Sequence, residues 1–232
     1  MSVFSRHGRE RFFQTETAFD YAWDDWRCTD YFYFNLDSVD SAFTDVSFLG
    51  CRGFIIAASE LVALKMAPMV DTIGMTDYLD AAWVSILEDG LCDYAVIAST
   101  DWQGPRLGPM WCAMMIVNDA LFEAVEDGGI RERCSYIHNL LLHILSPGQR
   151  AEYQTWMVGV INRLRKDHPR LPIEVDMLSP VQPMGAPCAP ETFILEHQFD
   201  PVRSKERLTA HRQQIPDTNR WLRTTPLRGI VG

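Results

Sequence analysis

The sequence predicts an all-α fold, and three observations support this prediction. Apolar residues recur at helical spacing in several segments, helix-start and helix-stop residues bound these segments, and only short links separate them. Short links place consecutive helices side by side and antiparallel. We therefore expect an antiparallel helical bundle or, as an alternative, stacked helical hairpins of the HEAT type.

Residues 147–167 carry the clearest helix signal. Ser146 is suited to cap the helix, Pro147 takes its first position, and Gln149 completes a capping box. The apolar face that follows has helical spacing and consists of Tyr153, Trp156, Met157, Val160, Ile161 and Leu164. Pro169 predicts the end of this helix.

Similar apolar stripes predict further helices at residues 12–27, 51–66, 76–93, 110–127 and 130–145. We expect Thr76 to cap the helix that it starts, and the glycines and prolines of residues 101–109 predict a loop. The tripeptide Glu88-Asp89-Gly90 recurs 38 residues later as Glu126-Asp127-Gly128. That period suits HEAT-like helix pairs, which keeps the hairpin-stack alternative open.

The character of the chain changes at residue 169. Prolines between residues 169 and 190 forbid a continuous helix, so we expect an extended segment packed on the surface of the bundle. Residues 173–178 and 191–197 each suit a short strand or ordered coil, and a short basic helix is expected near residues 203–214. The apolar content is too thin for a separate core. We therefore expect a helical domain at residues 1–168, with residues 169–232 packed on it and not independent.

The charge distribution bears on the class of partner. The formal net charge is −10, and residues 14–101 hold sixteen acidic residues against three basic ones. An acidic body repels nucleic-acid phosphates and attracts basic partners, so we expect a basic protein partner and no nucleic acid. Residues 197–232 have a net charge of +4, so folding of this basic tail onto the acidic body is the alternative to an external partner.

The sequence also bears on where the protein works. We see no signal peptide and no apolar run long enough to span a bilayer, so we expect a cytoplasmic protein with no membrane partner. The six cysteines include no CxxC motif and are expected to be reduced and mostly buried. Arginine outnumbers lysine eighteen to three, which indicates a GC-rich and bacterial source.

Metal and catalytic motifs are weak. Cys134 and His138 lie one helical turn apart, but zinc needs two more ligands, and we expect a core cysteine beside a flanking histidine. The carboxylate stripe of Glu16, Asp20 and Asp24 lacks the Glu-x-x-His partners of di-metal bundles. We predict no metal site, no cofactor and no catalytic residue.

Two polar residues interrupt apolar stripes. A buried Glu60 would have a raised pKa suited to acid–base chemistry, but the sequence names no partner for it, and an exposed position is the more common outcome. Asn118 lies within an apolar stripe, where we expect it to fix the register of the helices. The chain contains no GxSxG, Walker or GxGxxG motif, so the sequence leans away from an enzyme.

Residues 19–37, FDYAWDDWRCTDYFYFNLD, alternate rings with carboxylates. On a helix Phe19, Trp23 and Trp26 would face inward and the acids outward. Some of the following rings should then remain at the surface, as in a site for a basic protein or peptide. The predicted partner-binding residues are Asp20, Tyr21, Asp24, Asp25, Asp30, Tyr31 and Tyr33.

The preferred hypothesis is a non-enzymatic acidic protein that occludes a basic protein such as a toxin, as immunity proteins and inhibitors do. One alternative is a helical enzyme or small-molecule binder. Its pocket would be lined by Trp83, Met114, Met115, Trp156 and Met157. Another alternative is an adaptor that self-associates into a homo-oligomer through its helical faces.

Overall fold

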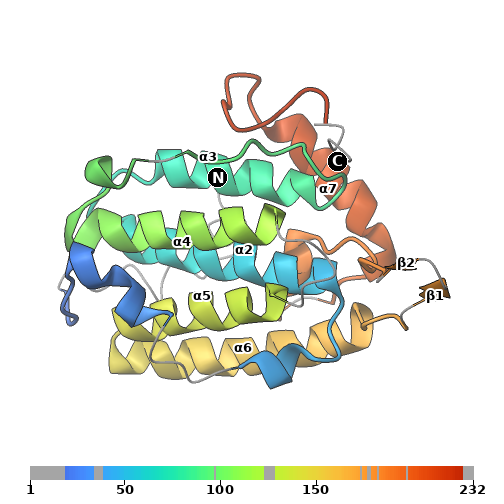
Figure 1. The fold of residues 1–232 in the computed structure, drawn as a ribbon, viewed down its shortest axis with the longest axis horizontal. Helices are drawn as coiled ribbons and strands as arrows, with labels where there is room; N and C mark the ends of the chain where they lie inside the picture. Colours follow the sequence, from blue (N-terminus) through green and yellow to red (C-terminus); the bar gives the residue numbers. More distant parts are fainter. Residues whose placement is uncertain are drawn as a thin grey trace.

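A computed structural model describes residues 19–33, 39–96, 98–122, 129–172, 174–176, 179–181, 183–196 and 198–226. The fold is all-α, as predicted, and its helices pack as a bundle (Figure 1). In the part of the chain that is described, the α-helices are α2 Phe48–Met66, α3 Ile73–Ser85, α4 Gly104–Phe122, α5 Ile130–Ile144, α6 Pro147–Asp167 and α7 Ser204–Gln214.

Helix α2 is the centre of the bundle. Every residue of α2 is buried, and α3, α4 and α5 all pack against it (Figure 1). A helix that is apolar on all sides needs neighbours on all sides, and this sequence supplies them. The arrangement is therefore a bundle around one helix; in a stack of hairpins each hairpin would contact only its neighbours.

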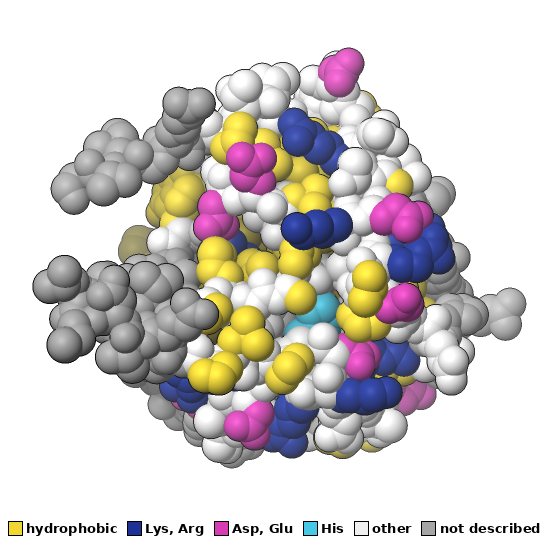
Figure 2. All heavy atoms as spheres, turned by 90° about the vertical axis from the view of Figure 1, so that its right-hand side faces the viewer, with side chains coloured by type: hydrophobic (Ala, Val, Ile, Leu, Met, Phe, Trp, Pro, Cys, Tyr) yellow, Lys and Arg dark blue, Asp and Glu magenta, His cyan; other side chains and the backbone are white. Residues whose placement is uncertain are grey.

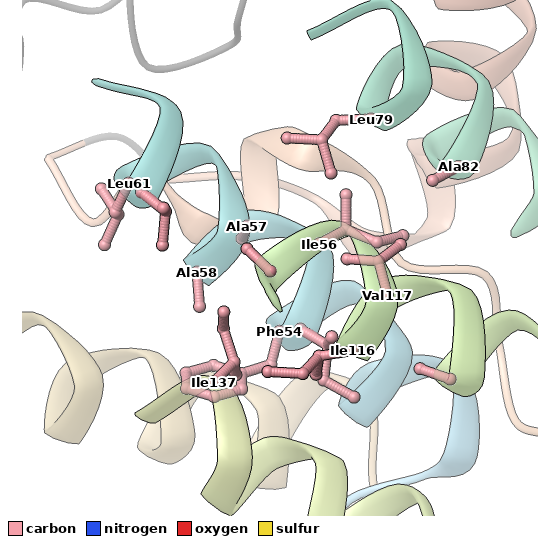
Figure 3. Close-up of a cluster of buried hydrophobic side chains, with 14 of the residues drawn as sticks. Phe54, Ile56, Ala57, Ala58, Leu61, Leu79, Ala82, Ile116, Val117 and Ile137 are labelled. Atoms are coloured by element: carbon pink, nitrogen blue, oxygen red, sulfur yellow. The ribbon is translucent and has the colours of Figure 1, made fainter. Parts of the chain in front are cut away.

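The side chains between these helices form one apolar core. Figure 3 shows Phe54, Ile56 and Leu61 of α2 among residues of α3, α4 and α5. Helix α6 joins the core through Trp156, whose ring stacks on Phe54 with a centroid distance of 5.9 Å. Since α2 lies at the centre, the outer helices surround it and the core is continuous.

The best-signalled helices agree closely with their predicted bounds. Helix α6 has Pro147 at its start and the capping box between Ser146 and Gln149. Helices α5 and α7 also match their predicted ranges within a few residues. All these signals are local in sequence, which is why they could be identified there.

Three predicted helix boundaries were wrong. Helix α3 begins at Ile73, whose backbone N–H donates to Asp71 at 2.9 Å, so Thr76 lies inside the helix and is not its cap. The same helix ends at Ser85, well before residue 93. The loop predicted at residues 101–109 is largely the start of α4, because Gly104 begins that helix.

The predicted helix at 12–27 is wrong in its described part. Residues 12–18 lie outside the described residues, and a 3-10 helix, η2 Asp25–Tyr31, is the first helical element thereafter. Asp24 caps η2 by accepting from the backbone N–H of Trp26 at 3.0 Å. Short acidic side chains compete in this way with a continuous α-helix.

The proline-rich segment packs against the bundle and contributes to its core. Strands β1 Glu174–Asp176 and β2 Ser179–Val181 form an antiparallel pair, and the 3-10 helix η6 Pro190–Phe193 follows. Phe193 is buried against Trp83, with 5.7 Å between ring centroids. Its carbonyl accepts from Trp156 Nε1 at 3.0 Å. The division into domains stays a prediction.

The basic tail folds back on the acidic body over its described residues. Helix α7 packs on α3, and Arg223 forms an ion pair with Asp93. His211 lies 3.3 Å from Asp80 of α3. The face of the molecule at this end shows acidic and basic side chains interspersed with hydrophobic ones (Figure 2). The tail thus neutralises part of the acidic body from within the chain.

Among the described helices, none is both long enough and apolar enough to cross a bilayer.

Candidate functional site

The predicted binding segment, residues 19–33, lies against the first turns of α4 and the last turn of α5 (Figure 1). Both hydrogen bonds and ring packing hold it there. The structure therefore brings the predicted site residues into one region, but it gives several of them a structural task.

A cluster of rings centres on His143 of α5. Tyr31 stacks on the imidazole at 4.0 Å between centroids with an interplanar angle of 11°, and Tyr21 approaches it at 5.5 Å. His143 Nε2 lies 2.8 Å from the carbonyl oxygen of Ala22, which assigns the Nε2–H tautomer. Burial lowers the pKa of His143, and nearby Arg150 lowers it too, although the Ala22 contact opposes both. The histidine is therefore held neutral.

Tyr21 completes the hydrogen bonding of α4. Pro109 lies inside this helix and has no N–H, so the carbonyl of Pro105, four residues earlier, lacks its usual helical donor. The hydroxyl of Tyr21 donates to that carbonyl. Burial raises the pKa of Tyr21, so the hydroxyl keeps the proton that it donates. Tyr21 is half-buried and repairs a proline defect in the neighbouring helix.

Asp25 fixes the start of α4. Its two carboxylate oxygens each lie 3.0 Å from the backbone nitrogen of Gly104, the first residue of α4. Oδ1 also accepts from Trp23 Nε1 at 2.8 Å. Trp23 packs on Gly108, where an added Cβ would lie only 2.3 Å from Trp23 Nε1. A carboxylate at a helix N-terminus is favourable because the N–H groups and the helix dipole both attract it.

The remaining predicted acids differ in their surroundings. Asp24 caps η2 and also donates its backbone N–H to the Tyr31 hydroxyl at 2.9 Å. Asp30 forms an ion pair with Arg27 at 2.7 Å. Asp20, Asp24 and Asp25 are exposed, so their charges face solvent even where they cap a helix.

Trp26 is the most exposed ring of the segment. Its side chain is 96% exposed, whereas the prediction placed it inward. Tyr33 is 46% exposed and its ring lies 5.1 Å from that of Tyr136. The signal that was missed is the capping pattern of Asp24. A helix capped by Asp24 has Trp26 in its first turn. The inward position predicted for Trp26 assumed a helix that began at residue 12, and η2 does not continue such a helix.

The other candidate residues lie in the interior. Glu60 is buried, contrary to the more common outcome, and accepts from Trp83 Nε1 at 2.8 Å. Asn118 Oδ1 accepts from Tyr78 at 3.2 Å and from the backbone N–H of Ala95 at 2.8 Å, the structural role expected of it. Both residues contact groups of other elements from within the bundle.

Most residues of the alternative pocket, and the Cys134 and His138 pair considered for zinc, are also buried. Trp83, Met114, Trp156 and Met157 are buried, and Met115 is partly exposed. His138 Nδ1 lies 3.1 Å from the Tyr153 hydroxyl. No group of three metal-ligating side chains occurs among the residues that the structure describes.

Comparisons with protein-family models, with curated proteins and with solved structures give no significant match for this chain. The fold and the site geometry are therefore the basis for a functional proposal.

Proposed function

We propose that this chain is a non-enzymatic acidic protein that binds a basic protein partner and occludes it, in the manner of immunity proteins and inhibitors. The contact region is the exposed part of residues 19–33, here termed the Trp26 surface. Trp26 and Tyr33 provide the aromatic contacts of this surface, and Asp20, Asp24, Asp25 and Asp30 provide the charge. Tyr21 and Tyr31 hold it in place from beneath. A cytoplasmic setting in a bacterium stays a prediction from the sequence.

The observation that carries the proposal is an almost fully exposed tryptophan on a segment that is held against the bundle by contacts on both sides of it. Trp26 is 96% exposed, while its neighbours on both sides are tied down by the Asp25–Gly104 contact and the Tyr31–His143 stack. Tryptophan is among the residues that contribute most to protein interfaces. A side chain presented on a rigid support loses less conformational entropy on binding, which favours affinity.

The charges around Trp26 favour a basic partner. Three exposed aspartates lie within six residues of it in sequence, and the chain has a formal net charge of −10. Such a field speeds association with a positively charged protein and makes the rate fall with added salt. Occlusion by shape and charge needs no catalytic group in this chain.

Salt dependence distinguishes binding that depends on these charges from non-specific binding. The chain is used as bait in lysate of its source organism, at low and high salt, alongside Asp20→Asn and a control, Glu152→Gln. Glu152 is exposed on α6 and carries the same charge away from the surface in question. We expect one stoichiometric basic protein, released by high salt and captured several-fold less by Asp20→Asn than by the control. Equal capture by both variants, or a captured protein without net positive charge, would argue against the proposal.

A further inference from the structure

The ring of Trp26 is open to solvent although an arginine of the same chain follows it directly. Trp26 is 96% exposed, and Arg27 is the next residue of η2. Asp30 holds the Arg27 side chain, because Arg27 Nε donates to Asp30 Oδ2 at 2.8 Å and Nη2 lies 2.7 Å from the same oxygen. The guanidinium of Arg27 is therefore engaged with a carboxylate one turn further along, and it leaves the ring of Trp26 uncovered.

A carboxylate is fixed beside the same residue. Asp24 Oδ1 accepts from the backbone N–H of Trp26 at 3.0 Å, and this contact ties the carboxylate to the backbone that carries the ring. The side chain of Asp24 is exposed, so its other oxygen, Oδ2, can accept a hydrogen bond from a partner. The Trp26 surface thus offers an aromatic face and a negatively charged acceptor within two residues of each other.

The chain itself shows which side chain fits such a combination. In α5 the guanidinium of Arg133 lies over the ring of Tyr136, with 5.3 Å from Cζ to the ring centroid. Nη1 of Arg133 is also 3.6 Å from Glu132 Oε2. A planar guanidinium can stack on a ring and donate to a carboxylate at the same time, whereas the compact ammonium of lysine is more strongly hydrated. A ring next to a carboxylate therefore favours arginine.

We propose that the Trp26 surface recognises an arginine of the basic partner, whose guanidinium stacks on the Trp26 ring and donates to Asp24 Oδ2. This inference rests on the proposed function and names the chemistry of its central contact. Asp30 then has a positioning task, because it holds Arg27 away from the ring that the partner's arginine occupies. A lysine in the same place keeps the attraction between charges but loses most of the stacking.

The direct test measures the binding of two dye-labelled peptides of equal charge, four Gly-Arg repeats and four Gly-Lys repeats, to the full chain by fluorescence anisotropy at low salt. With wild type and with Val202→Ala, at an exposed side chain of another element, we expect the Kd of the arginine peptide to be about three-fold lower. With Trp26→Ala, which removes the ring but no charge, we expect equal Kd values. Equal values or no binding in wild type, or a preference that persists in Trp26→Ala, would overturn the proposal.

Capture from lysate and peptide binding give separate answers. A captured basic protein together with equal binding of the two peptides would sustain the proposed function and overturn the arginine contact. A preference for the arginine peptide that depends on Trp26, without any captured protein, would sustain the arginine contact and overturn the proposed function.

The task of Asp30 is tested by Asp30→Asn, alone and combined with Arg27→Gln, which restores the net charge of wild type. In Asp30→Asn the released Arg27 competes for the ring, so we expect the ratio of the two Kd values to approach one. In the double variant we expect the wild-type ratio to return. A loss of charge alone would weaken both peptides equally. An unchanged ratio in Asp30→Asn, or a ratio of one in the double variant, would therefore overturn the task assigned to Asp30.

Discussion

At the scale of single residues, the polar groups of the 19–33 segment act largely on the helix they lie against. Tyr21 supplies the hydrogen bond that Pro109 cannot give to the Pro105 carbonyl. Asp25 supplies the acceptor for the first N–H of α4. The residues around Trp26 therefore have two tasks, because the groups that stabilise α4 also fix the surface.

Replacing Tyr21 by Phe tests the repair of the proline defect. The ring remains, but the Pro105 carbonyl loses its donor, and we expect a loss of about 1–3 kcal/mol in the free energy of unfolding. Urea denaturation measures this loss. The control is Tyr94→Phe, at a ring that is exposed, for which a change within about 0.5 kcal/mol is expected. Equal effects of the two substitutions would show that Tyr21 does not complete the helix.

His143 predicts a pH dependence of stability. Its pKa is lowered in the folded protein, so the neutral form is favoured by folding. The stabilisation is present above the unfolded-state pKa of about 6.5 and is lost as the pH falls through the lowered folded-state pKa.

The pH effect is measured as urea midpoints at pH 7.5 and pH 5.5. We expect the wild type to lose more stability over this interval than His143→Gln, which has no group to titrate there. Burial also lowers the pKa of His168. Because both proteins keep His168, its contribution cancels in the comparison. Parallel losses in the two proteins would contradict a neutral, partly buried His143.

At the scale of elements, local signals predicted some helices well and remote contacts decided others. The cap and apolar stripe of α6 lie within its own residues, and its bounds were predicted correctly. Helix α4 begins at Gly104 with an acceptor 79 residues earlier, Asp25, and no sequence window contains both. The outward position of Trp26 also depends on remote contacts, because η2 takes its conformation from its cap and from its packing against α4.

Asp25→Ala tests this remote cap. The substitution removes the acceptor for Gly104 N–H and for Trp23 Nε1, and we expect a loss of about 1–2 kcal/mol. Hydrogen exchange should become faster in the first turn of α4 while that of α6 is unchanged. Glu152→Ala, at an exposed position on α6, serves as the control and should leave both untouched. Unchanged protection at the start of α4 in Asp25→Ala would mean that the helix begins there without the cap.

At the scale of the whole molecule, residues far apart in sequence share one core. The all-α class followed from periodicity, but the central position of α2 did not, because its burial depends on which helices surround it. The buried position of Phe193 could not be predicted from the sequence either. It depends on Gly53 of α2, where an added Cβ would lie 3.1 Å from the Phe193 ring. Such complementarity exists only in the folded chain.

Phe193→Ala tests whether the proline-rich segment is integral to the bundle. A cavity at a fully buried ring should cost about 3–5 kcal/mol and lower the midpoint of the whole unfolding transition. The control is Val202→Ala, at a side chain that is 86% exposed, where little change is expected. A small effect confined to the segment itself, seen by hydrogen exchange, would show that the helices fold without it.

The measurement that tests the central claim most directly is quantitative capture by wild type, Trp26→Ala and Val202→Ala in parallel. Both substitutions shorten a highly exposed side chain, so neither should change stability by more than about 0.5 kcal/mol. We predict that wild type and Val202→Ala capture the same basic protein in equal amounts, and that Trp26→Ala captures at least ten-fold less. Capture of the same proteins by all three, or of no stoichiometric protein by any, would contradict a binding surface centred on Trp26.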